Sequence, residues 1–190
     1  MKAAGLFVLG ALCGLVVMAI PRAIGHLRAA FRSDRATKSA NDVRPHTHEE
    51  FEFTANGTLE QVAPLFGADK ERLWAEGWDP QFLFPLPGAD REGMVFTTEH
   101  HHRNAVWVNT ALDLKNGRVQ YVYVVPDAMA TLITLRLTPV ADKTHVAVIY
   151  ERTALSAETD KHVRNMAEGD RRCGAEWEQA VNGYLMQATR

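Results

Sequence analysis

The sequence has few of the residues and motifs that indicate a particular chemistry. Only two of the 190 residues are cysteine, Cys13 and Cys173. Their spacing does not form a metal-ligand set, so cysteine fixes neither the compartment nor the fold. No segment matches a phosphate-binding loop, a dinucleotide fingerprint, a zinc-protease helix or a nucleophile elbow. Any function therefore has to be argued from residues that the fold brings together.

Positive charge is also scarce in most of the chain. Residues 1–45 carry seven Lys/Arg and two Asp/Glu (net +5), whereas residues 46–190 carry 14 Lys/Arg and 21 Asp/Glu (net −7). Binding to a phosphate backbone needs a basic stripe or patch, which the acidic part lacks. The composition therefore predicts that nucleic acid is not a partner.

The basic end contains a run without charge. Residues 3–20 are 18 consecutive uncharged residues, and a helix of them covers most of a hydrocarbon core about 30 Å thick. The run is longer than the apolar part of a cleaved signal peptide, which is usually about 7–15 residues. We expect residues 1–22 to be an N-terminal membrane anchor, and a cleaved signal segment is the alternative.

The charges that flank this run predict an orientation. Lys2 alone precedes it, whereas Arg22, Arg28, Arg32, Arg35 and Lys38 follow it. The positive-inside rule then predicts a single-pass anchor with the body in the cytoplasm, and a periplasmic or secreted body is the alternative. Residues 32–45 are polar, small and mixed in charge, and we expect residues 23–45 to be a flexible basic tether.

The body, residues 46–190, begins with a strand and two short helices. Residues 49–54 alternate, with Phe51 and Phe53 on one face, which predicts a first strand. Short helices are predicted over residues 58–66 and 69–76.

Strand patterns follow, and then a long helical one. The chain alternates as about five or six antiparallel strands, and residues 156–186 repeat apolar side chains every three or four positions. This order of elements predicts an α+β domain with one long C-terminal helix, not a doubly wound fold.

Two hairpins can be aligned residue by residue. Asn116-Gly117 predicts a two-residue loop between strands, with Lys115 opposite Arg118. The pairs then expected on the inner face are Leu112–Tyr121, Thr110–Tyr123 and Val108–Val125, with Trp107 and Asn109 on the outer face. In the second hairpin the expected pairs are Leu137–Val146, Leu135–Val148, Ile133–Tyr150 and Thr131–Arg152.

Several of these features together resemble a known family. They are the box Trp74, Gly77, Trp78, Asp79, Pro80; the Tyr121 strand ending in Pro126; the strand end Tyr150, Thr153, Ala154, Leu155; and the helix with Trp177 and Tyr184. With the order of elements, they resemble the SRPBCC, or START-like helix-grip, superfamily, specifically its polyketide cyclase/dehydrase and lipid-transport-like branch. The resemblance covers about residues 46–188 of the helix-grip domain predicted over 46–190. It implies a curved sheet around the C-terminal helix, with a deep apolar cavity that residues 74–84 close on one side.

This resemblance and the predicted faces give a set of candidate ligand-binding residues. They are Phe53, Trp74, Trp78, Phe96, Thr110, Tyr121, Tyr123, Tyr150, Arg152, Asp170 and Trp177. The aromatic residues are equally explained by core packing, whereas inward tyrosine hydroxyls need a partner or a water. Arg152 and Asp170 are expected either to form a structural buried ion pair or to hold a polar ligand group.

A histidine-rich segment, residues 99–103, is a weaker candidate. His100 and His102 would share one strand face, but no third zinc ligand occurs at a fixed spacing. We interpret the segment as a solvated loop, and we expect neither a metal nor another cofactor.

Three functions are compatible with these patterns. The first is a membrane-tethered module that holds a hydrophobic small molecule or lipid between sheet and helix, with the membrane contacted through residues 3–20. The alternatives are a polyketide cyclase/dehydratase-type enzyme that uses the inward Tyr, Arg and Asp groups, and a non-catalytic adaptor with an exposed apolar patch.

Overall fold

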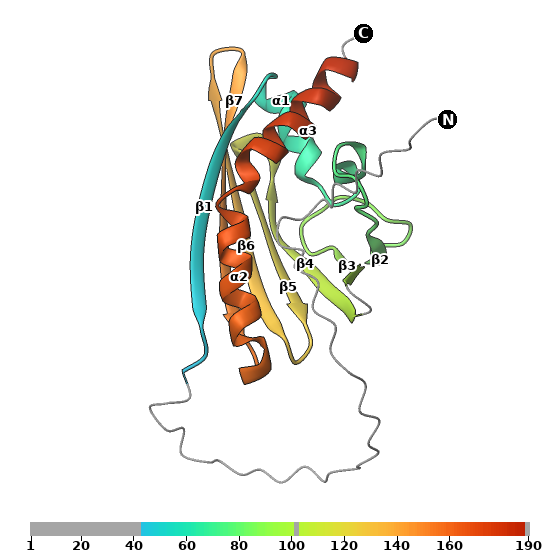
Figure 1. Ribbon diagram of the computed structural model, residues 1–190. Coiled ribbons are helices and arrows are strands. Elements are labelled where there is room, and N and C mark those ends of the chain that lie inside the picture. The colour runs from blue at the N-terminus through green and yellow to red at the C-terminus, as the bar shows by residue number, and fades with distance from the viewer. Residues whose placement is uncertain (1–42, 101–102, 189–190) are drawn as a thin grey trace, which may run out of the picture.

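One curved antiparallel sheet organises the domain (Figure 1). The computed structural model describes residues 43–100 and 103–188. Within them seven strands are ordered β1-β7-β6-β5-β4-β3-β2, each antiparallel to its neighbours. The strands are β1 His46–Ala55, β2 Gln81–Phe84, β3 Val95–His100, β4 Arg103–Asp113, β5 Arg118–Val125, β6 Met129–Val140 and β7 Lys143–Ala154. The predicted antiparallel α+β class is confirmed.

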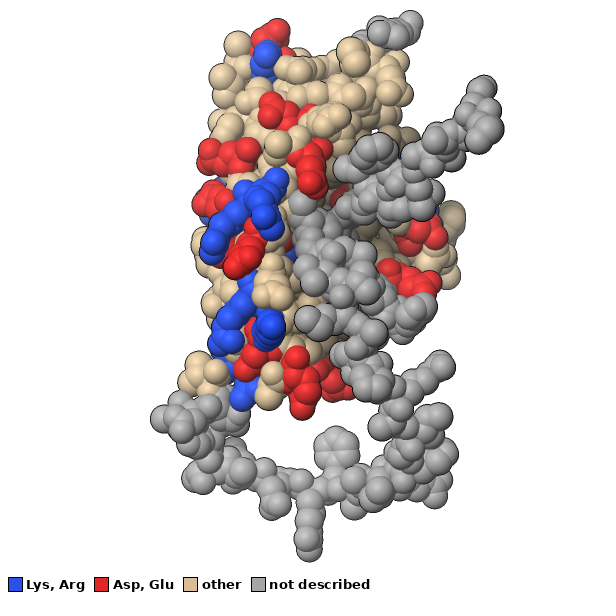
Figure 2. Space-filling model, viewed as in Figure 1, with Lys and Arg blue, Asp and Glu red and all other residues tan. Residues whose placement is uncertain are grey.

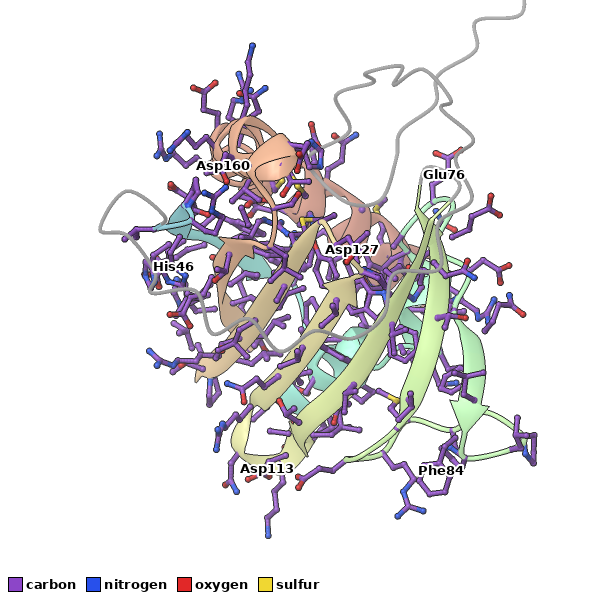
Figure 3. The ribbon with its side chains drawn as sticks, turned by 90° about the horizontal axis from the view of Figure 1, so that it is seen from below. His46, Glu76, Phe84, Asp113, Asp127 and Asp160 are labelled. Carbon is purple, nitrogen blue, oxygen red and sulfur yellow. The ribbon has the colours of Figure 1, made fainter. Side chains whose placement is uncertain are left out.

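The main helices lie on the concave face of this sheet, whereas the short helix η3 (Leu114–Asn116) forms the turn between β4 and β5 (Figure 1). Their bounds are α1 Leu59–Val62, η1 Ala63–Phe66, η2 Lys70–Leu73, η3 Leu114–Asn116, η4 Ala157–Thr159, α2 Asp160–Asp170 and α3 Cys173–Ala188, where η denotes a 3-10 helix. α2 and α3 pack against β1 (Figure 1). The side chains between helices and sheet form the core (Figure 3).

The register of the β6–β7 hairpin is as predicted. Leu137 lies opposite Val146, Leu135 opposite Val148, Ile133 opposite Tyr150, and Thr131 opposite Arg152. This register places Tyr150 and Arg152 on the face that meets the helices, because alternate residues of a strand point to the same side.

The predicted register of the β4–β5 hairpin is wrong. Asp113 pairs with Arg118 around the η3 turn, and a bulge between Asn109 and Ala111 shifts the pairs beyond it. The buried Asn109 side chain donates hydrogen bonds of 3.1 Å to the carbonyls of Ala111 and Gln120, which flank the bulge. A one-residue shift reverses the two faces of a strand. Trp107 is therefore buried, and Thr110 is exposed on the outer face.

The single long C-terminal helix is also corrected. The chain leaves the helix at Arg171 and Arg172, between α2 and α3. Gly169 and Gly174 flank this break, and glycine weakens a helix by about 1 kcal/mol relative to alanine. At Gly174 an added Cβ would lie 3.0 Å from the carbonyl oxygen of Glu52. The break therefore brings the helix backbone close to β1 and lets two shorter helices follow the curved sheet.

The predicted anchor and nearly all of the predicted tether lie outside the described residues, as do His101 and His102 of the histidine-rich segment. In the described part of the chain, none of the helices combines the length and the apolar character that a membrane crossing requires.

Candidate functional site

Residues 63–78, here called the lid, cover one end of the space between the sheet and α3. Three aromatic side chains hold the lid by hydrogen bonds to its backbone. The Trp74 indole donates to the Leu65 carbonyl at 2.7 Å, and the Trp78 indole donates to the Ala68 carbonyl at 2.7 Å. The Tyr121 hydroxyl of β5 donates to the Phe66 carbonyl at 2.9 Å. The lid contains only short 3-10 helices, so several of its carbonyl groups lack the backbone N–H donors that a longer helix would provide. The three aromatic side chains provide donors to these carbonyl groups instead.

Aromatic rings pack under the lid in two groups. Trp177 of α3 lies 5.2 Å from Trp74 and 5.4 Å from Phe51, measured between ring centroids. Trp107 lies 5.3 Å from Trp78 and 4.2 Å from Tyr123. These separations are typical of favourable aromatic pairs. Much of the aromatic surface of residues 74–84 therefore contributes to packing, as the alternative interpretation proposed.

A small cavity remains between the lid, the sheet and α3. Its volume is about 20 Å³, which is enough for a water-sized group and far below the roughly 300–1,000 Å³ of ordinary ligand pockets. Among the described residues, this cavity is much smaller than the deep one that the resemblance implied. The lining residues are Phe66, Glu71, Trp78, Phe96, Trp107, Tyr121, Ile133, Leu135, Tyr150 and Trp177.

Among the described residues that line this cavity, Glu71 is the one with a charged side chain. It is partly buried, and its carboxyl group makes no hydrogen bond or ion pair with any described residue. Burial raises the pKa of Glu71 to about 8, and the nearby Asp90 carboxylate contributes to the rise. Burial also raises the pKa of Asp90, although backbone N–H groups of Asp69 and Lys70 oppose this effect. Glu71 is therefore largely protonated at neutral pH.

Tyr150 is the second polar group on the cavity wall that lacks a partner. Its side chain is 2% exposed, and no described residue hydrogen-bonds its hydroxyl. Burial raises the pKa of Tyr150, and Arg152 opposes the rise, while Asp170, Tyr123 and Glu71 add to it. A tyrosine hydroxyl at a cavity wall can still donate to, or accept from, a molecule in the cavity. The cavity thus offers two hydrogen-bonding groups, Glu71 and Tyr150, to whatever occupies it.

The ionic group predicted to face a ligand is used internally. Arg152 donates to both carboxylate oxygens of Asp170, at 2.9 and 2.8 Å, and also to Tyr123 and Thr131. Arg152 and Asp170 are 1% and 0% exposed, and neither they nor Tyr123 lines the cavity. These groups converge on one another, so they form the structural ion pair that was one of the two expectations.

The structure thus divides the predicted site residues. Trp78, Phe96, Tyr121, Tyr150 and Trp177 line the cavity, whereas Phe53 and Trp74 pack behind the lining. Thr110 lies outside and bonds the side chain of Gln120. Sequence reasoning missed Glu71, Phe66 and Trp107. A correct β4 register would have revealed Trp107, but no sequence signal separates Glu71 from an exposed residue of a short helix.

Comparison with known proteins identifies the class of fold. No protein-family profile and no curated protein sequence matches the chain. Among solved structures it is similar to norcoclaurine synthase from Thalictrum flavum, with a TM-score of 0.56 and 11% identity over 85% of this chain and 99% of that one. It is also similar to Zhui aromatase/cyclase from Streptomyces sp. R1128, with a TM-score of 0.56 and 15% identity over 77% and 97%. Mll3558 protein from Rhizobium loti gives a TM-score of 0.51 and 20% identity over 74% and 98%.

These similarities, at identities of 20% or less, concern the fold. The domain is an α+β helix-grip domain, a class in which a curved antiparallel sheet surrounds a C-terminal helix. More specifically, it has the fold of the SRPBCC superfamily, as the sequence pattern predicted.

Proposed function

We propose that this domain binds a largely apolar small molecule that carries one polar group. The observation that supports the proposal is the pair of unpartnered polar side chains, Glu71 and Tyr150, in a cavity otherwise lined by apolar and aromatic residues. Such a site gains affinity from buried apolar area and orientation from a few polar contacts. The two groups would hold the polar end of the ligand, and the aromatic rings would contact its body.

Binding requires the lid to move. The cavity of about 20 Å³ admits a water-sized group, but not the body of an apolar ligand. The indole and phenol hydrogen bonds to residues 65, 66 and 68 hold the lid in place. A ligand that displaces the lid would exchange these contacts for its own, so the lid-open conformation is a minor state that the ligand selects.

The proposal includes a place at the membrane. The uncharged run 3–20 and the positive charges after it support an uncleaved anchor, with the domain held near the cytoplasmic surface by residues 23–45. A lipid or another membrane-soluble compound would then reach the lid directly. Two of the similar solved proteins are named as a synthase and an aromatase/cyclase, one of them in complex with dopamine and hydroxybenzaldehyde, which supports a small organic molecule as the ligand class.

A cyclase/dehydratase-type activity is the second candidate, and Glu71 is the observation that favours it. A carboxyl group with a pKa of about 8 is suited to proton transfer near neutral pH. For such an activity the acid–base group would be Glu71. Tyr123 and Asp170 instead accept hydrogen bonds from Arg152. An adaptor role would instead use the exposed side chains of Leu83, Phe84 and Leu86.

Native mass spectrometry of the full chain in a mild detergent tests the binding proposal. A co-purifying small molecule is expected on the wild type and not on Leu135→Phe, which fills the cavity. Leu137→Phe is the matched control, because Leu137 is buried on the same face of β6 but does not line the cavity. A bare polypeptide mass, with no change in tryptophan fluorescence on titration with apolar compounds, would contradict the proposal.

A further inference from the structure

Glu71 carries the one charge among the described residues that line the cavity. The nearby cation Arg152 lies behind the wall, 4.5 Å from the centre of the Tyr150 ring. Arg152, the buried cation of β7, has its donors on Asp170, Tyr123 and Thr131. Glu71 has no basic partner among the described residues, and the Asp90 carboxylate adds to the rise of its pKa. Lys70 offsets part of the charge of Asp90, whereas the Glu71 carboxylate would be stabilised by a positive ligand.

The cavity walls favour the same sign of ligand. Phe66, Trp78, Phe96, Trp107 and Trp177 present aromatic rings to the cavity, with Tyr121 and Tyr150. Aromatic faces carry negative electrostatic potential and attract cations within about 6 Å, most strongly where water is excluded. The domain already contains such a contact, because the Arg152 guanidinium lies 4.5 Å from the centre of the Tyr150 ring.

The hydrogen-bonding groups at the cavity wall select among cations. A volume of about 20 Å³ accepts a group of the size of water, and a primary ammonium group is of that size. It also carries three N–H donors, which match the Glu71 carboxylate and the Tyr150 hydroxyl oxygen. A trimethylammonium group has no N–H donor, so it cannot form hydrogen bonds with these acceptors.

Long-range charge adds to this preference. Residues 69–92, which include the second half of the lid and β2, carry six Asp/Glu and three Lys/Arg. Residues 46–190 together have a net charge of −7, from 14 basic and 21 acidic side chains. The electric field of this net negative charge raises the local concentration of cations and the rate at which they associate with the domain. On the face that carries α2 and α3, basic side chains are interspersed with acidic ones (Figure 2).

We propose that the polar group recognised by this site is a primary ammonium group, so that the ligand class is an apolar or aromatic primary amine whose nitrogen lies between Glu71 and Tyr150. This inference rests on the proposed binding function and adds the chemistry of the recognised group. The amine binds as a cation, so Glu71 releases its proton when the complex forms.

Three probes that share a 2-phenylethyl group and differ in their polar group test this inference on the full chain in detergent. They are 2-phenylethylamine, 2-phenylethanol and trimethyl(2-phenylethyl)ammonium, titrated at pH 7 by isothermal calorimetry. The amine is expected to bind at least about tenfold more tightly than the alcohol, as for a hydrogen-bonded charge, and more tightly than the quaternary compound. The measured heat should vary with the ionisation enthalpy of the buffer, because a proton is released.

Glu71→Gln is the diagnostic variant, since it keeps the shape of the side chain and removes its charge. It should weaken amine binding by about 10–100-fold and change alcohol binding little. Glu76→Gln is the matched control, because Glu76 belongs to the same lid but is exposed at the edge of the molecule (Figure 3). Circular dichroism of each variant separates a loss of binding from a loss of fold.

The affinity of the amine should also depend on pH. The groups that face Glu71 are Asp90, Tyr121 of β5 and Tyr150 of β7. Burial raises the pKa of both tyrosines above their usual range, so they keep their protons up to pH 9. Glu71 is then the group that titrates in the measured range, and amine affinity should rise toward pH 8 and level off above it.

The outcomes distinguish this inference from the proposed function. Equal binding of amine and alcohol, or an unchanged amine affinity in Glu71→Gln, would overturn the ammonium inference and leave the apolar binding site intact. If none of the probes binds while native mass spectrometry still finds a small non-amine ligand, the inference fails alone. If neither experiment finds a ligand, both proposals fail.

Discussion

Arg152 of β7 and Asp170 of α2 form two parallel hydrogen bonds, Nε to Oδ2 at 2.9 Å and Nη2 to Oδ1 at 2.8 Å, with both side chains almost fully buried. The pair joins the sheet to the last residue of α2, immediately before the break in the C-terminal helical region. Burial raises the pKa of Asp170, and the guanidinium of Arg152 opposes the rise. The pair fixes the position of α2 but does not reach the cavity.

Removing one member of this pair should be strongly destabilising. Arg152→Met leaves the Asp170 carboxylate buried without a partner, which should cost about 3–5 kcal/mol of unfolding free energy. Arg171→Gln is the matched control, because Arg171 follows Asp170 directly but pairs with Glu49 at the surface, and a surface pair contributes about 0–1 kcal/mol. Urea unfolding followed by circular dichroism measures both. Equal effects of the two substitutions would contradict a buried, charged pair.

Glu71 should make the stability of the domain depend on pH. The pKa of Glu71 is near 8 in the folded domain, against 4.5 for an ordinary glutamate. The folded state therefore holds a proton that the unfolded chain has lost between these values, so stability should fall as pH rises from about 5 to 8. Since Glu71 is partly exposed, we expect a change on the order of 1–3 kcal/mol.

Glu71→Gln should remove most of this dependence and raise stability at pH 8 and above. Part of the slope should remain, because burial also raises the pKa of Asp90. Thermal unfolding at intervals between pH 5 and pH 9 measures the effect. A wild-type stability that is flat over this interval would show that Glu71 ionises as an ordinary surface carboxyl.

The lid should loosen when one of its hydrogen bonds is removed. Trp74→Phe keeps a ring near Phe66 and Trp177 but deletes the donor to the Leu65 carbonyl, which should cost about 1 kcal/mol. Hydrogen exchange should increase in residues 63–78 and stay unchanged in β5–β7, which serve as the internal control. A ligand probe should also associate severalfold faster. Unchanged exchange in the lid would mean that other contacts hold it.

How far the sequence predicts this structure depends on how local the deciding contacts are. The β6–β7 register follows from alternation and a two-residue loop between Val140 and Lys143. The β4–β5 register does not, because the Asn109 side chain stabilises a bulge by bonding the carbonyl of Gln120 on the next strand. The Asn-Gly signal located the turn, but the loop comprises residues 114–117 and not Asn116-Gly117 alone, and no local signal reported the bulge.

The candidate site likewise contains residues that a local sequence pattern predicts and one that depends on contacts between distant parts of the chain. Tyr121, Tyr150 and Trp177 lie in long regular elements, where periodicity assigns a face. Glu71 lies in the four-residue 3-10 helix η2, which is too short to show a period. Its importance arises from Asp90 and the aromatic walls, which come from other parts of the chain.

The corrected register of β4 predicts opposite effects for two residues three positions apart. Trp107 is 3% exposed and packs on Tyr123 and Trp78, so Trp107→Ala should cost about 3–5 kcal/mol. Thr110→Ala should change stability by no more than about 0.5 kcal/mol, because Thr110 is exposed. Chemical denaturation of both variants decides between the two registers. The reverse order of effects would restore the register predicted from the Asn-Gly turn.

The proposed anchor predicts where the full chain is found in the cell. Because residues 3–20 are uncharged and the positive charges follow them, the tagged full-length protein should sediment with membranes and resist extraction by high salt. Replacing Leu15 and Val16 by Arg should release it, because charges near the middle of a spanning helix cost about 2.5–3.5 kcal/mol each. Replacing Ser39 and Ala40 by Arg in the proposed tether is the matched control and should leave the protein bound to membranes.

Protease accessibility tests the orientation of the anchor. Protease added to intact cells should not reach a cytoplasmic domain. Recovery of only a shortened soluble form would instead identify a cleaved signal segment, and the ligand would then have to reach the lid from solution.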